Sequence, residues 1–152
     1  MINYGKQTLE DDDITSVLEV LRENTFLTTG PWVGKFEKKI AQYVNSEYAV
    51  AVNSGTAALH CACDAIGIGP GDEVIVPTIS FVASANCVAY CGAKPILCEI
   101  NPDTLNIDPT KIRKLINKKT KAIIMVDMCG QPCDFNAIKK IADKYKLFII
   151  QD

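Results

Sequence analysis

This sequence has no large excess of positive or negative charge. Its 16 Lys and Arg residues against 18 Asp and Glu residues give a formal net charge of −2. Such a balance does not predict a nucleic-acid or membrane partner. Histidine is nearly absent too: His60 is the only one, and it lies between Leu59 and Cys61. A lone histidine there is more typical of a packed or half-exposed helix position than of catalysis.

The CxxC spacing of zinc and redox sites is also missing. The number of cysteines is odd: Cys61, Cys63, Cys87, Cys91, Cys98, Cys129 and Cys133. Neither a disulfide framework nor a metal site is therefore expected, and small buried residues in a reducing cytoplasm explain these cysteines better. Residues 1–13 become acidic instead of apolar, so no secretory signal is predicted. The expected location is the cytoplasm.

A dinucleotide-binding loop and a membrane span are excluded by position. Gly67, Gly69 and Gly71 precede a predicted strand, whereas the glycines of a GxGxxG loop follow one. Residues 74–93 are uncharged and about as long as a membrane span. They include Pro77 and several polar side chains, so a buried strand followed by a helix is the better explanation.

Helical and strand patterns alternate along most of the chain. Two helices are expected first, one over 9–23 and one after Gly30-Pro31, since apolar residues recur there at helical spacing. The later strands are continuous apolar runs, which is typical of parallel strands buried under helices on both faces. The sequence therefore predicts an α/β fold with a mainly parallel sheet flanked by helices. The predicted strands are 48–52, 73–76, 95–100, 122–126 and 147–150, and the helices between them are 54–66, 80–90, 109–116 and 135–144.

The start of the helix at 54–66 is a candidate phosphate site. In open α/β sheets, ligands bind beyond the carboxyl ends of the strands, and Ser54-Gly55-Thr56 follows the first predicted strand. Free N–H groups, two hydroxyls and a glycine suit a bound anion. A plain helix cap by Asn53 or Ser54 explains the same residues equally well.

Three further residues follow other strands at the same edge of the predicted sheet. Phe81 follows the second strand and could lie flat on an aromatic ligand, although core packing is the commoner role. Asp127 and the turn with Gln131 follow the fourth strand, and a loop that caps the next helix is the simpler interpretation. Asp152 follows the last strand, where a carboxylate could pair with a cationic ring nitrogen or be a solvated end. Together with the phosphate site, these residues would frame a flat, phosphorylated, cationic ring such as pyridoxal 5′-phosphate (PLP).

These motifs resemble the DegT/DnrJ/EryC1/StrS family of PLP-dependent sugar aminotransferases, which have the fold type I (aspartate aminotransferase-like) architecture. Order and spacing agree over essentially the whole chain. The resemblance implies that Gly55 and Thr56 bind the phosphate, that Phe81 stacks on the pyridine ring and that Asp152 pairs with its nitrogen. The motifs that carry the resemblance are Leu27-Thr28-Thr29-Gly30-Pro31, Asn53-Ser54-Gly55-Thr56-Ala57-Ala58-Leu59, Gly69-Pro70-Gly71-Asp72-Glu73-Val74-Ile75-Val76-Pro77, Phe81-Val82-Ala83-Ser84, Gly130-Gln131-Pro132 and Ile150-Gln151-Asp152.

The same resemblance implies a substrate side and a reaction. Thr28 and Thr29 would lie near the substrate and Gln131 close to the active site, while Asp127 stands where many members carry histidine and receives no catalytic role. The implied reaction passes an amino group from glutamate or glutamine to a keto-sugar linked to a nucleotide, for polysaccharide or glycan biosynthesis. Homodimers are expected of the full-length family.

The resemblance also implies that residues 1–152 are the N-terminal part of a PLP-binding large domain. The Schiff-base lysine, the rest of that domain and a small C-terminal domain are expected beyond Asp152, so the chain alone is expected to be inactive. Three alternatives stay open: a sugar dehydratase of the same family with histidine in place of the lysine, a non-catalytic remnant, and an unrelated nucleotide-binding domain.

Overall fold

The computed structural model describes residues 5–23, 26–28 and 30–152. The chain divides into two compact units, Met1–Ala51 and Val52–Asp152. The first contains helices α1 (Asp11–Glu23) and α2 (Trp32–Tyr43), where the sequence predicts them. In the described part of the chain, no helix is both long and apolar enough to cross a membrane.

The predicted strand at residues 48–52 is wrong. These residues form no regular element, and the side chains of Tyr48 and Val50 are 75% and 77% exposed. An apolar run becomes a strand only when a neighbour accepts its backbone hydrogen bonds, and no described strand pairs with this segment. Side chains bond to it instead: the N–H of Ala51 donates to Oε1 of Glu37 at 2.9 Å, and the Ser46 hydroxyl donates to the carbonyl of Tyr48 at 2.6 Å.

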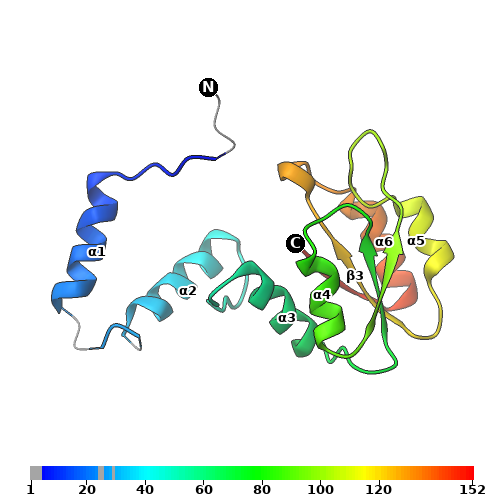
Figure 1. Ribbon diagram of the computed structural model, residues 1–152, viewed down its shortest axis with the longest axis horizontal. Helices are drawn as coiled ribbons and strands as arrows, with labels where there is room; N and C mark the ends of the chain where they lie inside the picture. Colours follow the sequence, from blue (N-terminus) through cyan, green and yellow to red (C-terminus); the bar gives the residue numbers. More distant parts are fainter. Residues whose placement is uncertain (1–4, 24–25, 29) are drawn as a thin grey trace. The chain divides into compact units, whose positions relative to one another are not determined.

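The second unit is built on a four-stranded parallel sheet, which confirms the predicted fold class (Figure 1). Its order is β2-β1-β3-β4, so the chain crosses over the sheet between strands. Every strand lies within about two residues of its predicted position. The strands are β1 (Glu73–Pro77), β2 (Lys94–Cys98), β3 (Thr120–Met125) and β4 (Phe148–Gln151).

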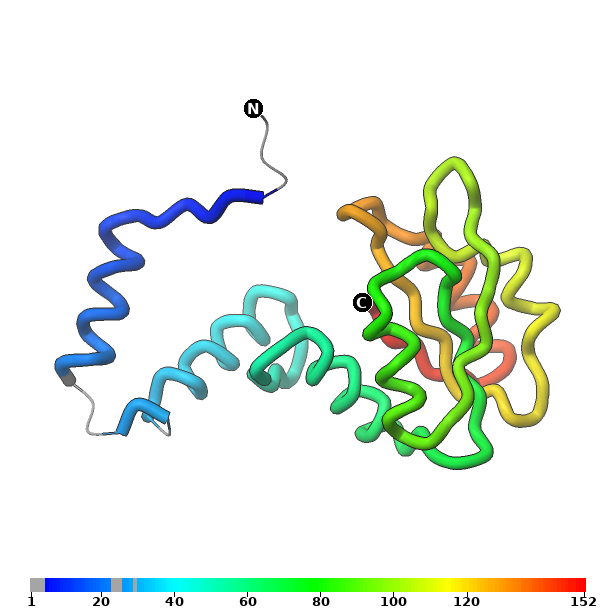
Figure 2. The backbone as a smooth tube through the Cα atoms, viewed as in Figure 1, coloured from blue at the N-terminus to red at the C-terminus, as the bar shows by residue number. Residues whose placement is uncertain are grey.

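Helices cover both faces of this sheet, as the buried apolar strands require. Along β1, Val74 and Val76 pack into one core with α3 (Gly55–Ala65) and α4 (Ala83–Tyr90). Ile75, between them, packs into a second core with α5 (Pro109–Leu115) and α6 (Phe135–Tyr145). The backbone trace in Figure 2 follows these crossovers. The alternation along one strand therefore accounts for the two helical layers.

One boundary differs from the prediction. Helix α4 begins at Ala83, three residues after the predicted start at Ser80. The N–H of Thr78 donates to the carbonyl of Cys98 at 2.9 Å, which prolongs the pairing of β1 with β2 past Pro77. The residues after Thr78 turn the backbone away from the sheet, so α4 starts only at Ala83.

Candidate functional site

Asp152 lies at the carboxyl end of β4, and its carboxylate is held by a buried hydroxyl. Oγ of Ser84 lies 2.5 Å from Oδ2 of Asp152, and Ser84 is 2% exposed. Ser80 completes the chain of hydroxyls, with its Oγ 2.6 Å from that of Ser84. Since the Ser84 proton goes to the carboxylate, Ser80 donates to Ser84. The other oxygen of the Asp152 carboxylate, Oδ1, does not bond to these hydroxyls and can accept a hydrogen bond from another donor.

Phe81 lies beside this carboxylate, just before α4. Its carbonyl accepts the N–H of Ser84 at 3.2 Å, so one residue ties Phe81 and Asp152 together. The Phe81 side chain is 74% exposed, and core packing is therefore not its role in this structure. The sequence predicts Phe81 in the first turn of a helix, whereas in the structure Phe81 precedes α4. An exposed aromatic ring and a fixed carboxylate, linked through Ser84, suit a flat cationic ligand.

The start of α3 combines both interpretations that the sequence leaves open. Ser54 is the N-cap, and its Oγ accepts the N–H of Ala57 at 3.1 Å. The N–H groups of Gly55 and Thr56 come first in the helix and have no partner within it. A Cβ placed on Gly55 would meet nothing within 4 Å, so the approach to these groups is open. Unpaired N–H groups at the start of a helix are a common binding position for anions.

Helix α3 packs against the same face of the sheet as α4. Leu59, one turn after Gly55, lies in one core cluster with Ala83 and Ile150. Ala83 is two residues from Phe81, and Ile150 is two residues from Asp152. One core cluster thus connects α3 with residues near Phe81 and Asp152.

Gln131 lies in a loop that starts at the same edge, after β3. The loop contains a 3₁₀ turn, Met128–Gly130, that the sequence does not predict. The N–H of Asp127 donates to the carbonyl of Asp152 at 3.2 Å, which continues the pairing of β3 with β4 into the loop. Gln131 itself is exposed.

Asp127 organises this loop. Its Oδ1 accepts the N–H of Cys133 at 2.9 Å, and its Oδ2 accepts Nε2 of Gln151 at 2.5 Å. The N–H of Cys133, helped by Gln151, holds the pKa of this carboxyl below its usual range. Asp127 therefore shapes the loop, while the cap of α6 that the sequence predicts from this loop is supplied by Asp134.

Sequence reasoning missed two residues that shape the site. Ser84 could have been found from the sequence, because it is the polar residue on the face of α4 that Ala83, Cys87 and Val88 bury. A serine on such a face needs a polar partner. Nothing local in the sequence indicates Asn106: it is 3% exposed, and the partners of its side chain lie more than twenty residues away.

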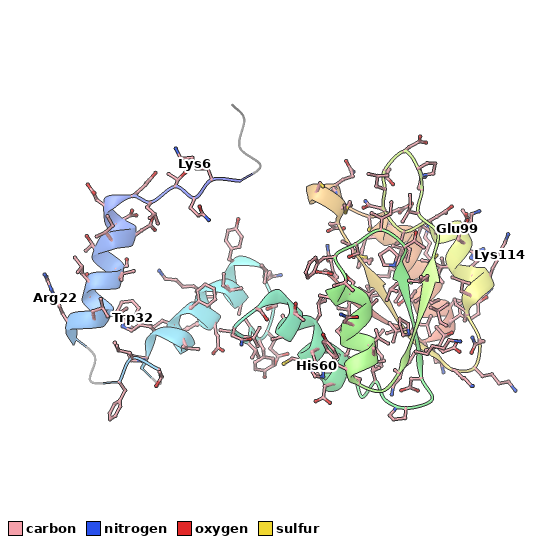
Figure 3. The ribbon with its side chains drawn as sticks, viewed as in Figure 1. Lys6, Arg22, Trp32, His60, Glu99 and Lys114 are labelled. Atoms are coloured by element: carbon pink, nitrogen blue, oxygen red, sulfur yellow. The ribbon has the colours of Figure 1, made fainter. Side chains whose placement is uncertain are left out.

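The remaining candidates lie elsewhere. Thr28 is exposed in the segment between α1 and α2, within the first unit, and Thr29 lies outside the described residues. His60 is exposed on α3, with its ring 5.5 Å from that of Tyr90, centroid to centroid (Figure 3).

Comparison with known proteins decides the family. The model of the DegT/DnrJ/EryC1/StrS aminotransferase family matches residues 7–152. The chain belongs to this family. The DegT/DnrJ/EryC1/StrS resemblance of the sequence is thereby confirmed over nearly its whole length.

Two curated DegT/DnrJ/EryC1/StrS relatives have names that state a nucleotide sugar. GDP-perosamine synthase of Caulobacter vibrioides is 42% identical over 151 residues, which is 99% of this chain and 41% of that protein. UDP-2-acetamido-2-deoxy-3-oxo-D-glucuronate aminotransferase of Pseudomonas aeruginosa is 41% identical over 144 residues, which is 95% of this chain and 40% of that protein. The chain thus spans about two fifths of the length of each.

Solved structures agree with the fold and carry the cofactor. Spr1654 from Streptococcus pneumoniae matches with a TM-score of 0.92 and 31% identity, over 99% of this chain and 42% of that one. It has been solved in a PLP form and in a pyridoxamine phosphate (PMP) form.

Proposed function

We propose that the full-length polypeptide containing this chain is a PLP-dependent aminotransferase that aminates a keto-sugar linked to a nucleotide. Glutamate or glutamine is the amino donor, and the product serves polysaccharide or glycan biosynthesis. Family membership and the names of the two nucleotide-sugar relatives support this reaction class. The observation that carries it is the Asp152 carboxylate, fixed by Ser84, whose N–H also bonds to the backbone of the exposed Phe81.

The start of α3 would hold the phosphate. The N–H groups of Gly55 and Thr56 would donate to its oxygens, and the positive end of the helix dipole would favour its charge. Ser54 keeps its hydroxyl on Ala57 in the structure, so it would contribute by fixing the first turn, with its own contact to the phosphate still a prediction. The open space at Gly55 supports this assignment.

Asp152 and Phe81 would hold the ring. When bound, PLP supplies an electron sink that lets an amino group be removed from one substrate and given to another. Asp152 would keep the ring nitrogen protonated, while Ser84 holds Oδ2 of the carboxylate. Phe81 would cover the ring and exclude water from it.

Thr28, Thr29 and Gln131 are proposed to contact the nucleotide sugar. The domain assignment is also a proposal: residues 1–152 supply the first part of the PLP-binding domain, and the Schiff-base lysine comes from another part of a longer polypeptide. The relatives support this, since the chain matches only 41% and 40% of their lengths. A homodimer and a cytoplasmic location stay predictions.

The experiment is an amino-transfer assay on the full-length protein. After loading with PLP and glutamate, the enzyme is given UDP-2-acetamido-2-deoxy-3-oxo-D-glucuronate, and amino-sugar formation is followed by mass spectrometry. In a second assay the PLP-loaded enzyme is given GDP-perosamine, whose amine should pass to the cofactor and leave a ketone. Transfer with either sugar supports the proposal. Tight PLP binding without transfer from or to any nucleotide sugar would contradict it.

A further inference from the structure

We propose that Asn106 is a positioning residue that holds Gln131 in place to recognise the sugar hydroxyls of the substrate. This role rests on the proposed function, and it names Gln131 as the residue of the site that recognises the sugar. Asn106 lies in the hairpin between β2 and α5, far in sequence from the loop that follows β3.

Asn106 commits both polar atoms of its side chain to the backbone of that loop. Its Nδ2 donates to the carbonyl of Gln131 at 2.8 Å, and its Oδ1 accepts the N–H of Met128 at 3.0 Å. At 3% exposure, the amide is shielded from water, so these bonds are not readily exchanged for solvent. One buried side chain therefore fixes the loop at two points three residues apart.

The backbone between those two points is strained. Cys129 has φ 53° and ψ 28°, which is the left-handed backbone region that residues other than glycine and asparagine rarely adopt. Such a conformation persists only where the surroundings impose it, and it gathers at ligand-binding positions. Asn106 imposes it by holding Met128 and Gln131 on either side.

The other anchor of the loop is next to the proposed ring site. Asp127 accepts the N–H of Cys133 and donates its own N–H to the carbonyl of Asp152. The backbone of the loop is thus tied at one end to the residue proposed to hold the cofactor ring, and at the other to Asn106.

The Gln131 side chain is left available. Within the described part of the chain, its amide makes one contact, a long one of 3.5 Å from Nε2 to the carbonyl of Pro132. A primary amide offers two donors and an acceptor, which matches the hydroxyls of a sugar. A rigid backbone under a free amide is the arrangement that a recognition residue needs, because little entropy is lost when the ligand binds.

The test is a double-mutant cycle on the full-length, PLP-loaded enzyme, with GDP-perosamine as the probe and the UDP-keto-sugar as a second probe for the PMP form. Asn106→Ala and Gln131→Ala should each raise KM for the sugar about tenfold, the effect of one lost hydrogen bond. The rate of the half-reaction with glutamate should not change. Because Asn106 acts through Gln131, the double variant should be no worse than Gln131→Ala.

Asn106→Asp provides a second variant of the same size that keeps the acceptor for Met128 and removes the donor to Gln131, should Asn106→Ala fail to fold. Asn136→Ala, at an exposed position on α6, is the matched control and should leave both KM values unchanged. Unchanged sugar KM in the folded Asn106 variants, or effects that add to those of Gln131→Ala, would overturn the positioning role. A wild-type enzyme that turns over neither sugar would instead overturn the proposed function and this role with it.

Discussion

At the residue scale, the site depends on a few polar atoms in fixed positions. The sequence predicts Asp152 and Phe81 from their places after strands, and the structure connects the two through Ser84. The strand predicted before Gly55-Thr56 is absent, and that pair begins α3 after an irregular segment. The sequence does not predict Ser84 as the partner of Asp152, because a hydrogen bond between residues 68 positions apart depends on tertiary packing. Local pattern identifies which residues follow strands, and only the fold identifies their partners.

Replacing Ser84 by alanine should weaken PLP binding about tenfold, because Asp152 loses a charge-assisted hydrogen bond that orients its carboxylate. The measurement is a titration of the full-length apoprotein with PLP, followed by absorbance. Ser46→Ala is the control, since the Ser46 hydroxyl bonds to the Tyr48 carbonyl in the other unit. If Ser84→Ala bound PLP as tightly as the wild type, the orienting role of this hydroxyl would be wrong.

Two buried thiols should make stability depend on alkaline pH. Burial, more than the neighbouring carboxylates, raises the pKa of Cys98 and of Cys133 to about 11 each. In the unfolded chain a thiol ionises near about 8.5, so these thiols contribute their full stability below that pH. That stability is lost as pH rises from about 8.5 towards 11, because only the unfolded state gives up its protons.

The check is Tm against pH for the full-length protein and for two variants. Cys98→Ala should flatten the decline in Tm between about pH 8.5 and 11, whereas Cys61→Ala, at an exposed position, should not. Comparing variants removes the background from lysines that titrate in the same range. Parallel curves for Cys98→Ala and wild type would contradict the assignment.

At the scale of elements, continuous apolar runs and helix caps predict most of the second unit. Asp108 caps α5 and Asp134 caps α6, each accepting an N–H from the first turn. The predictions fail where hydrogen bonds outside the element decide the outcome. Residues 48–52 pair with no described strand, and Thr78 delays α4 by bonding to Cys98.

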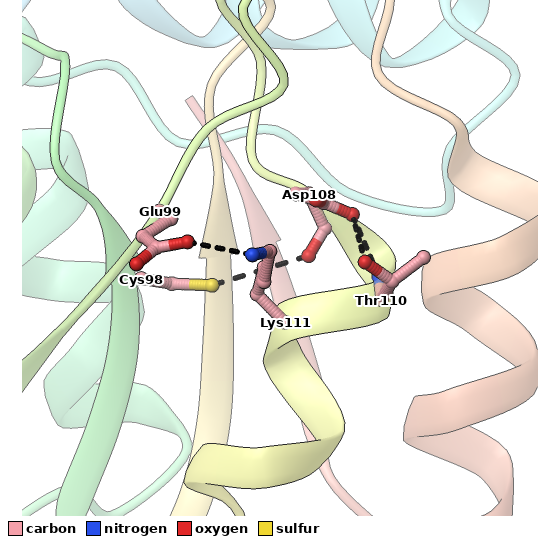
Figure 4. A network of polar contacts seen from close by, with 5 residues as sticks. All are labelled: Cys98, Glu99, Asp108, Thr110 and Lys111. Carbon is pink, nitrogen blue, oxygen red and sulfur yellow. Dashed lines mark hydrogen bonds and ion pairs between the residues drawn. The ribbon is translucent and has the colours of Figure 1, made fainter.

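The start of α5 allows a cap and an ion pair to be compared in one place (Figure 4). Oδ1 of Asp108 accepts the N–H of Thr110 at 2.8 Å, and Nζ of Lys111 lies 2.9 Å from Oε2 of Glu99. Asp108→Ala should lower the free energy of unfolding by about 1 kcal/mol, the usual value of an N-cap. Glu99→Ala should change it less, because exposed ion pairs are screened by water. Urea unfolding measures both, and a larger loss for Glu99→Ala would reverse this ranking.

At the scale of the whole molecule, parallel strands explain why the site lies where it does. Since β1, β3 and β4 run in the same direction, the residues after each of them meet at one edge, and Leu59 of α3 packs into the core on one face of this sheet. The alternation of strands and helices predicts this edge from sequence. The order of the strands and the Asn106 contact to the loop arise from long-range packing, which no local pattern encodes.

The central claim, that the carboxylate at the end of β4 serves a PLP ring, is tested most directly by Asp152→Ala in the full-length protein. The amino-transfer rate should fall at least about a hundredfold, the scale seen when a fixed charge partner of a reacting group is removed, and PLP should bind more weakly. Asp143→Asn, at an exposed position that pairs with Lys139, is the control and should keep wild-type activity. An Asp152→Ala enzyme that folds, binds PLP and transfers amino groups at the wild-type rate would contradict the account.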